Sequence, residues 1–94
     1  MCEAQFIIWA ARELYQVMTT PIERDQRLTA SRAFVSTFAR RVDVLDSEER
    51  RRALDRLDQW ISIGQIDGYT LPSDKETFSW LEGIVGTLIG LLED

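Results

Sequence analysis

Histidine is absent from this sequence, and cysteine occurs once, as Cys2. Without histidine the chain lacks the most frequent general base of enzymes and the most frequent zinc ligand. Cys2 has no partner for an internal disulfide and no histidine to activate its thiol, and nothing in the sequence assigns it a function. No acidic cluster has calcium-loop spacing, and no glycine-rich segment follows a strand as a phosphate-binding loop does. We therefore expect no catalytic activity, no cofactor and no metal site.

Long apolar runs are also missing. A bilayer-spanning helix needs roughly 18 to 20 apolar residues, and no segment of the chain reaches that length. The first 15 residues lack the basic lead and the small-residue cleavage site of a secretory signal, and a single cysteine is typical of a reducing compartment. These features predict a cytoplasmic protein without membrane contact. The length of 94 residues predicts one domain, residues 1–94.

Positive charge is the scarcer sign, since 11 basic residues face 16 acidic ones and the net charge is −5. The basic residues gather in the middle of the chain, where residues 24–56 hold nine arginines against six acids. Residues 57–94 hold one lysine against seven acids. Because this acidic part repels a phosphate backbone and the basic middle does not offset it, we predict no nucleic-acid binding.

Three four-residue patterns predict the beginnings of helices. They are TPIE from Thr20, DSEE from Asp46 and SDKE from Ser73. In each, the first side chain can accept hydrogen bonds from backbone N–H groups that the first helical turn leaves unpaired. The glutamate three residues later can accept from the backbone N–H of that first residue. Pro21 suits the first position of a helix. Each pattern precedes apolar residues at spacings of three and four, so the sequence predicts an all-α, single-domain fold with four helices near residues 3–19, 21–45, 47–63 and 74–92.

The residues between the predicted helices are consistent with these boundaries. Gly64 is placed to end the third helix, and Asp67-Gly68 is the expected turn of the one long loop, residues 64–73. No alternating run is long enough to predict a convincing strand.

Apolar spacing separates the predicted core from the predicted surface. The core stripes of the second and third helices comprise Leu28, Ser31, Phe34, Val35, Phe38, Val42 and Leu45, and Ala53, Leu54, Leu57, Trp60 and Ile61. The opposite side of the third helix is predicted to be a solvated face with i, i+4 ion pairs, Glu48 with Arg52 and Arg51 with Asp55. The alternative is that this helix binds an acidic partner through its arginines, which are Arg50, Arg51, Arg52 and Arg56.

The fourth predicted helix is apolar on two sides. One stripe comprises Phe78, Leu81, Val85, Leu88 and Leu92, and the other comprises Trp80, Ile84, Thr87 and Leu91, flanked by Gly83, Gly86 and Gly90. A glycine inside a helix costs about 0.5 to 1 kcal/mol relative to alanine, so three of them suggest that another backbone comes close. The helix is then either a partner or subunit interface, with a homodimer as the expected assembly, or a central helix enclosed by its own three neighbours.

Trp9 is the second unusual apolar residue. On a helical projection it lies among Gln5, Arg12, Glu13 and Gln16. The core contacts of its helix are expected from residues on its two flanks, which are Phe6, Ala10, Leu14 and Val17, and Ala4, Ile8, Ala11 and Met18. Tryptophan is enriched among residues that dominate interface energy, so Trp9 is predicted to contact a partner from outside the core. The alternative is that it covers a loop or stacks on Arg12.

The small size, the excess apolar surface and the missing catalytic residues favour a protein that acts by contact. The first hypothesis is a small cytosolic regulatory protein that binds and inhibits a larger protein, as an anti-activator or a phage or bacterial inhibitor does. The residues predicted to form the partner or dimer interface are Trp9, Trp80, Gly83, Ile84, Gly86, Thr87, Gly90 and Leu91. One alternative is a structural or assembly subunit that only self-associates, and a weaker one is an acidic mimic of nucleic acid.

Overall fold

Four α-helices form the chain in a computed structural model that describes residues 2–93. They are α1 (Glu3–Thr19), α2 (Arg24–Arg41), α3 (Ser47–Ile63) and α4 (Lys75–Glu93), with a 3-10 turn, Val42–Val44, after α2. No strand occurs within the described residues. The prediction of an all-α, four-helix fold is confirmed.

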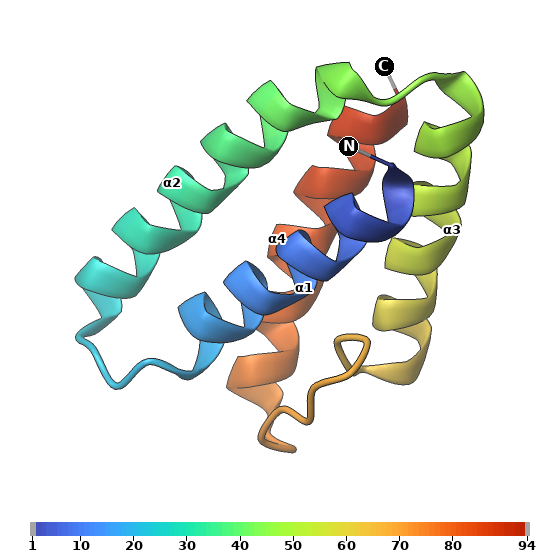
Figure 1. Cartoon of the computed structure of the whole chain (residues 1–94). Coiled ribbons are helices and arrows are strands. Elements are labelled where there is room, and N and C mark those ends of the chain that lie inside the picture. The colour runs from blue at the N-terminus through green and yellow to red at the C-terminus, as the bar shows by residue number, and fades with distance from the viewer. Residues whose placement is uncertain (1, 94) are drawn as a thin grey trace.

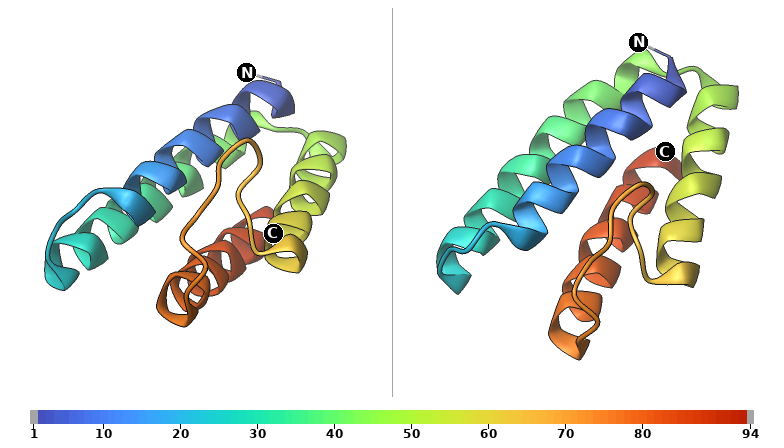
Figure 2. Two further views of the ribbon diagram at one scale, coloured as in Figure 1. Left: turned by 90° about the horizontal axis from the view of Figure 1, so that it is seen from below. Right: turned by 60° about the horizontal axis from the view of Figure 1, so that its bottom comes forward.

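The helices pair as two hairpins, α1 with α2 and α3 with α4 (Figure 1). Figure 2 shows the first hairpin on one side of the molecule and the second on the other. Across this division α1 packs against α3, and α2 packs against α4. Each helix therefore has two principal neighbours and keeps one side toward solvent.

The start of α2 differs from the prediction, because the helix begins at Arg24 rather than at residue 21. The Thr20 hydroxyl, expected to cap α2, instead donates to the Gln16 carbonyl at 2.6 Å and so completes the end of α1. Glu23 is the residue that precedes α2, and its backbone N–H donates to the Gln26 side chain at 3.0 Å. The α-helical part of α2 also ends at Arg41, before the predicted end at residue 45.

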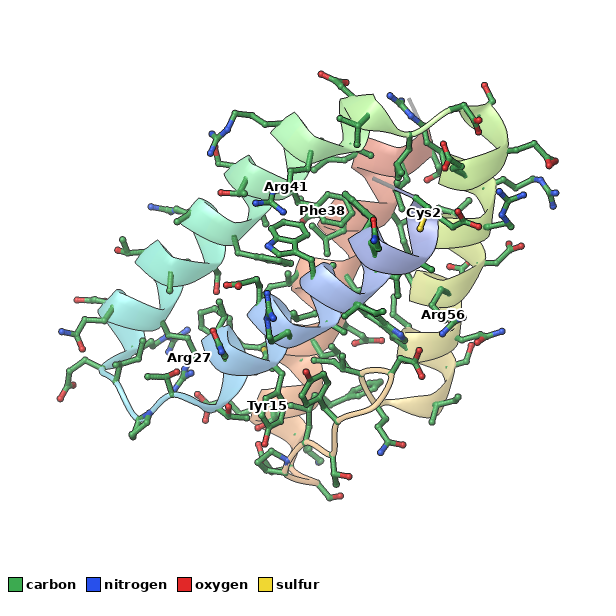
Figure 3. The ribbon with its side chains drawn as sticks, in the orientation of Figure 1. Cys2, Tyr15, Arg27, Phe38, Arg41 and Arg56 are labelled. Carbon is green, nitrogen blue, oxygen red and sulfur yellow. The ribbon has the colours of Figure 1, made fainter. Side chains whose placement is uncertain are left out.

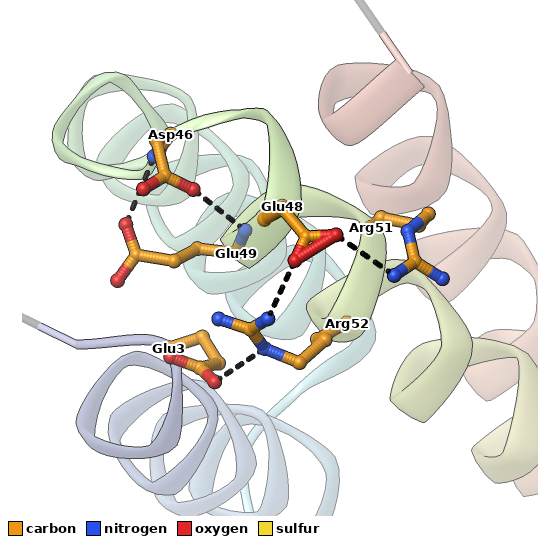
Figure 4. Close-up of polar contacts among 6 residues, drawn as sticks. All are labelled: Glu3, Asp46, Glu48, Glu49, Arg51 and Arg52. Atoms are coloured by element: carbon orange, nitrogen blue, oxygen red, sulfur yellow. Dashed lines mark hydrogen bonds and ion pairs between the residues drawn. The ribbon is translucent and has the colours of Figure 1, made fainter.

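The start of α3 is confirmed. The Asp46 carboxylate accepts from the Glu49 N–H at 2.8 Å, and the Glu49 carboxylate accepts from the Asp46 N–H at 3.0 Å (Figure 4). For α4 the capping residue is Asp74 and not Ser73. Asp74 accepts from both the backbone N–H and the hydroxyl of Thr77, each at 2.8 Å, and this pair of bonds moves the start of the helix one residue along.

Gly64 and Gly68 have the roles that the sequence predicts. Gly64 ends α3 in the left-handed region, with φ of 73°, and its N–H donates to the Trp60 carbonyl at 2.8 Å. Gly68 has φ of 82° in the turn closed by the Tyr69 N–H and the Ile66 carbonyl at 3.0 Å. The same loop buries Ile66 and Leu71, which spacing did not identify because a loop has no helical period.

Buried residues of all four helices form the core. Within the first hairpin, Phe6 of α1 contacts Phe38 of α2 edge-on at a ring distance of 4.9 Å. Most predicted core residues of α2 and α3 are buried or half-buried. Leu28 is the exception at 40% exposed, and Val35 is only half-buried, because both lie beside the open groove described below. On α1, Ile8 is 65% exposed and Ile7 takes the core position instead.

Candidate partner-binding groove

The fourth helix, α4, is not enclosed by its own neighbours. It buries Leu81, Ile84, Val85, Leu88 and Leu92, whereas Gly83, Gly86 and Gly90 are exposed. A methyl group built on any of these three glycines would have no neighbour within 4 Å. The interpretation of α4 as a central helix is therefore wrong, and the close approach that its glycines permit is not used within the described chain.

An open groove of about 600 Å³ runs between α2 and α4. From α4 it is lined by four of the predicted contact residues together with Ser79: Trp80, Gly83, Ile84 and Thr87. From α2 it is lined by Leu28, Ser31, Val35 and Ser36, with Arg24 and Arg32 beside them. The walls are therefore largely apolar, with basic side chains on the α2 side.

The remaining predicted contact residues lie outside this groove. Gly86 and Gly90 are on the exposed side of α4, and Leu91 is half-buried against the core. Trp9 belongs to the interface between α1 and α2, away from α4. The eight residues thus do not form one surface.

The prediction that Trp9 stands apart from the core is wrong. Its indole is half-buried, with ring distances of 5.8 Å to Phe6, 5.7 Å to Phe34 and 6.4 Å to Phe38. The guanidinium of Arg41, rather than that of Arg12, lies 4.3 Å from the ring centre. Figure 3 labels Arg41 and Phe38 on α2, where they face α1. A helical projection of α1 could not reveal these contacts, because the partners of Trp9 other than Phe6 belong to α2.

Two of the four hydroxyl groups that line the groove are used within the helices. The Ser31 hydroxyl donates to the Arg27 carbonyl at 2.8 Å, and the Thr87 hydroxyl donates to the Gly83 carbonyl at 3.0 Å. Such bonds to the preceding turn leave the hydroxyl donors occupied. The charged residues that line the groove are both arginines, so we expect these side chains to bind a charged group of an occupant.

Arg24 and Arg32 are the two cations of the groove, and the sequence interpretation missed them. Within residues 2–93 neither side chain makes a hydrogen bond, an ion pair or a ring contact. A signal was present in the sequence, since neither arginine has a carboxylate three or four residues away that could pair with it along the helix. Both also share one side of α2 with Leu28.

The arginines of α3 differ, because each contacts an acidic group of its own chain. Arg50 pairs with Asp43 at 3.6 Å, Arg51 with Glu48 at 3.1 Å, and Arg52 with Glu48 at 3.2 Å. Arg56 pairs with Asp67 of the loop. The predicted pair of Glu48 with Arg52 is present, whereas Arg51 pairs with Glu48 and not with Asp55. These contacts reduce the support for an acidic partner at α3.

Arg52 also connects α3 to α1. The prediction of a solvated face with ion pairs inside α3 did not include this contact. Its Nε donates to the Glu3 carboxylate at 2.6 Å (Figure 4). This hydrogen bond is the main reason that the pKa of Glu3 lies below its ordinary value. The pKa of Asp74 is lowered mainly by the backbone N–H that Thr77 donates to it.

These two carboxylates should make the fold less stable in acid. A carboxyl group whose pKa is lower in the folded than in the unfolded chain stabilises the fold above its ordinary pKa, and this contribution disappears as the pH falls through the lowered pKa. The ordinary values are 4.5 for Glu3 and 3.8 for Asp74. Glu3 is half-buried beside Arg52 and Asp74 is exposed, so water screens both groups and the effect is small.

The measurement is the midpoint of thermal unfolding between neutral pH and about pH 3. The wild type should lose more stability over this range than the double variant Glu3→Gln/Asp74→Asn, which keeps both shapes but cannot ionise. Parallel pH profiles for the two proteins would contradict this prediction.

None of the helices within residues 2–93 has both the length and the apolar character needed to span a membrane. Comparisons with protein-family models, with curated proteins and with solved structures found no match to this chain. A functional proposal therefore depends on the surface chemistry described above.

Proposed function

We propose that this chain is a small cytoplasmic regulatory protein that binds and inhibits a larger protein, acting by contact and without catalysis. The partner contacts the groove between α2 and α4. The observation that carries this proposal is an apolar groove of about 600 Å³ in which the Ser31 and Thr87 hydroxyls donate within their own helices and the arginine side chains have no partner in the described chain. Exposed apolar surface of this kind commonly marks an interaction site.

The groove is a better candidate than the chain's other exposed apolar side chains. Ile8, Val44 and Ile63 are more than half exposed but come from three different segments, α1, the 3-10 turn and α3. Scattered exposure of single apolar residues is normal for a folded protein. In the groove, Leu28 and Trp80 face a common hollow from two helices, and no acidic residue lines it. Ile63 of α3 and Phe78 of α4 also share a hollow, but its lining includes Asp74 and Lys75.

A structural or assembly subunit is the second candidate, and one observation favours it. Ser79, Gly83, Gly86 and Gly90 give α4 an exposed side of small residues, on which a second helix could approach closely. In this alternative the chain is a homodimer whose copies meet through α4. An acidic mimic of nucleic acid is the weaker candidate, supported only by the acidity of residues 57–94.

Purification of the tagged chain from the cells that produce it, followed by mass spectrometry, tests the proposed function. We expect a heterologous protein in stoichiometric amount, whose activity falls when the purified chain is added. Recovery of the chain alone, with a mass of two copies in sedimentation, would favour the assembly subunit instead. A single-copy mass without any captured protein would contradict both candidates.

A further inference from the structure

Positive charge in the α2–α4 groove contrasts with the net charge of the chain, which is −5. Arg24 and Arg32 line the groove, and none of its other lining residues is acidic. Four other hollows on the described surface each include at least one carboxylate among their lining residues. The groove therefore combines apolar walls with cations that the chain's own acids do not neutralise. This combination is complementary to an occupant that is apolar and acidic.

The spacing of the groove residues fits an α-helix. On α2, Leu28 and Val35 are seven residues apart, and on α4, Trp80, Ile84 and Thr87 follow at intervals of four and three. Both intervals are those at which one side of a helix repeats. A third helix that lies along the groove can therefore place an apolar side chain between the walls at each turn.

Backbone recognition of an extended peptide has less support. Such a peptide usually adds to the edge of a sheet, and the described residues form no strand. The Ser31 and Thr87 hydroxyls already donate within their own helices. An occupant that satisfies its own backbone hydrogen bonds, as a helix does, needs none of these groups.

The two arginines set the expected position of the acidic groups. Arg24 and Arg32 are eight residues apart on α2, which corresponds to about 12 Å along a helix. Carboxylates seven or eight residues apart on a parallel or antiparallel helix span nearly the same distance. Guanidinium groups bind carboxylates through two parallel hydrogen bonds, which gives the contact a defined geometry.

We propose that the groove binds an amphipathic α-helix of the partner, with an apolar stripe directed between α2 and α4 and carboxylates on the flank that faces Arg24 and Arg32. The inference rests on the proposed function, since it specifies the chemistry of the partner's contact segment. Gly83 leaves one wall low enough for a bulky side chain of that helix.

The test uses two synthetic helical peptides that differ only in charge. Both carry leucines at positions i, i+4, i+7 and i+11; one carries glutamates seven residues apart on a single flank, and the other carries lysines there. The acidic peptide should bind the full-length chain about tenfold more tightly at low salt, a preference that two partly exposed charge pairs can supply. Its binding should shift the amide signals of Gly83 in proton–nitrogen spectra, and added salt should weaken it.

Charge reversal in the chain supplies the matched comparison. The variant Arg24→Glu/Arg32→Glu should prefer the lysine peptide. The control Arg12→Glu/Arg51→Glu has the same net charge, but its substitutions are at exposed positions outside the groove. It should keep most of the preference for the acidic peptide. Circular dichroism confirms that all proteins are folded.

Equal affinity for the two peptides, no binding of either, or an equal response of both double variants would overturn the inference. Shifts at Ile63 and Phe78 in place of Gly83 would also overturn it, since they lie elsewhere on the surface. A second copy in the groove would appear as a two-chain mass in sedimentation and an absence of peptide binding. If a heterologous protein is still captured through the groove after the peptide test fails, the proposed function stands and only the acidic-helix chemistry is rejected.

Discussion

Replacement of Trp9 by alanine should lower the free energy of unfolding by about 2 kcal/mol, which is roughly half the usual cost of truncating a fully buried tryptophan. The indole is half-buried between Phe6, Phe34 and Phe38 and is covered by Arg41. For a domain of this size the melting temperature should fall by about 10 °C. Urea unfolding at 25 °C measures the loss directly. A change below about 0.5 kcal/mol, the range of ordinary surface substitutions, would contradict the packing role of Trp9.

Arg41→Gln is the control for this substitution, because it removes only the cation above the ring and should cost about 0.5 to 1 kcal/mol. Folded Trp9→Ala protein should bind its partner within about twofold of the wild type, because Trp9 does not line the groove. If Trp9 were instead an anchor of the partner contact, its truncation would weaken binding at least about tenfold. A tenfold loss of partner affinity in folded Trp9→Ala protein would indicate that the partner contacts α1 and not the groove.

Gly83→Leu should reduce partner capture at least tenfold, a change of about 1.4 kcal/mol or more in binding free energy. Gly83 lines the groove, and a leucine there places its side chain in the space that the partner would occupy. The fold should tolerate the change, because no atom lies within 4 Å of the added Cβ. Removing a glycine from the helix should even stabilise it by about 0.5 to 1 kcal/mol.

Gly90→Leu is the matched control for Gly83→Leu. Gly90 is also an exposed glycine of α4 with open space around its Cα, but it does not line the groove. It should gain similar helix stability and capture the partner as the wild type does. If both variants capture the partner equally well, the groove is not the contact surface. If both lose it, the partner contacts the exposed small-residue side of α4 and not the groove alone.

Helix positions were predictable because each helix boundary is set by groups that lie within a few residues of it in the sequence. Asp46 and Gly64 delimit α3 as their local chemistry indicates. The error at α2 has the same local origin, since Thr20 could donate backward to Gln16 or cap forward, and the backward bond is formed. A pattern of residue types does not determine which of two such bonds prevails.

Half of the candidate groove was predictable, and the other half was not. Helical periodicity identified Trp80, Gly83, Ile84 and Thr87 on one helix, and these residues do line the groove. The α2 wall depends on which helices become neighbours, and that is a property of the whole fold. Leu28 has the spacing of a core residue and is exposed only because α2 and α4 leave a groove between them. The same dependence on a neighbouring helix explains the error at Trp9.

Hydroxyl-radical footprinting of the chain with and without its captured partner tests the central claim most directly. Leu28 and Phe78 are each 40% exposed in the free chain, so they form a matched pair of reporters, one in the groove and one outside it. We predict that the partner slows oxidation of Leu28 and of the neighbouring Trp80 and leaves Phe78 unchanged. Protection of Phe78 with Leu28 and Trp80 unchanged would contradict the assignment of the α2–α4 groove as the contact surface.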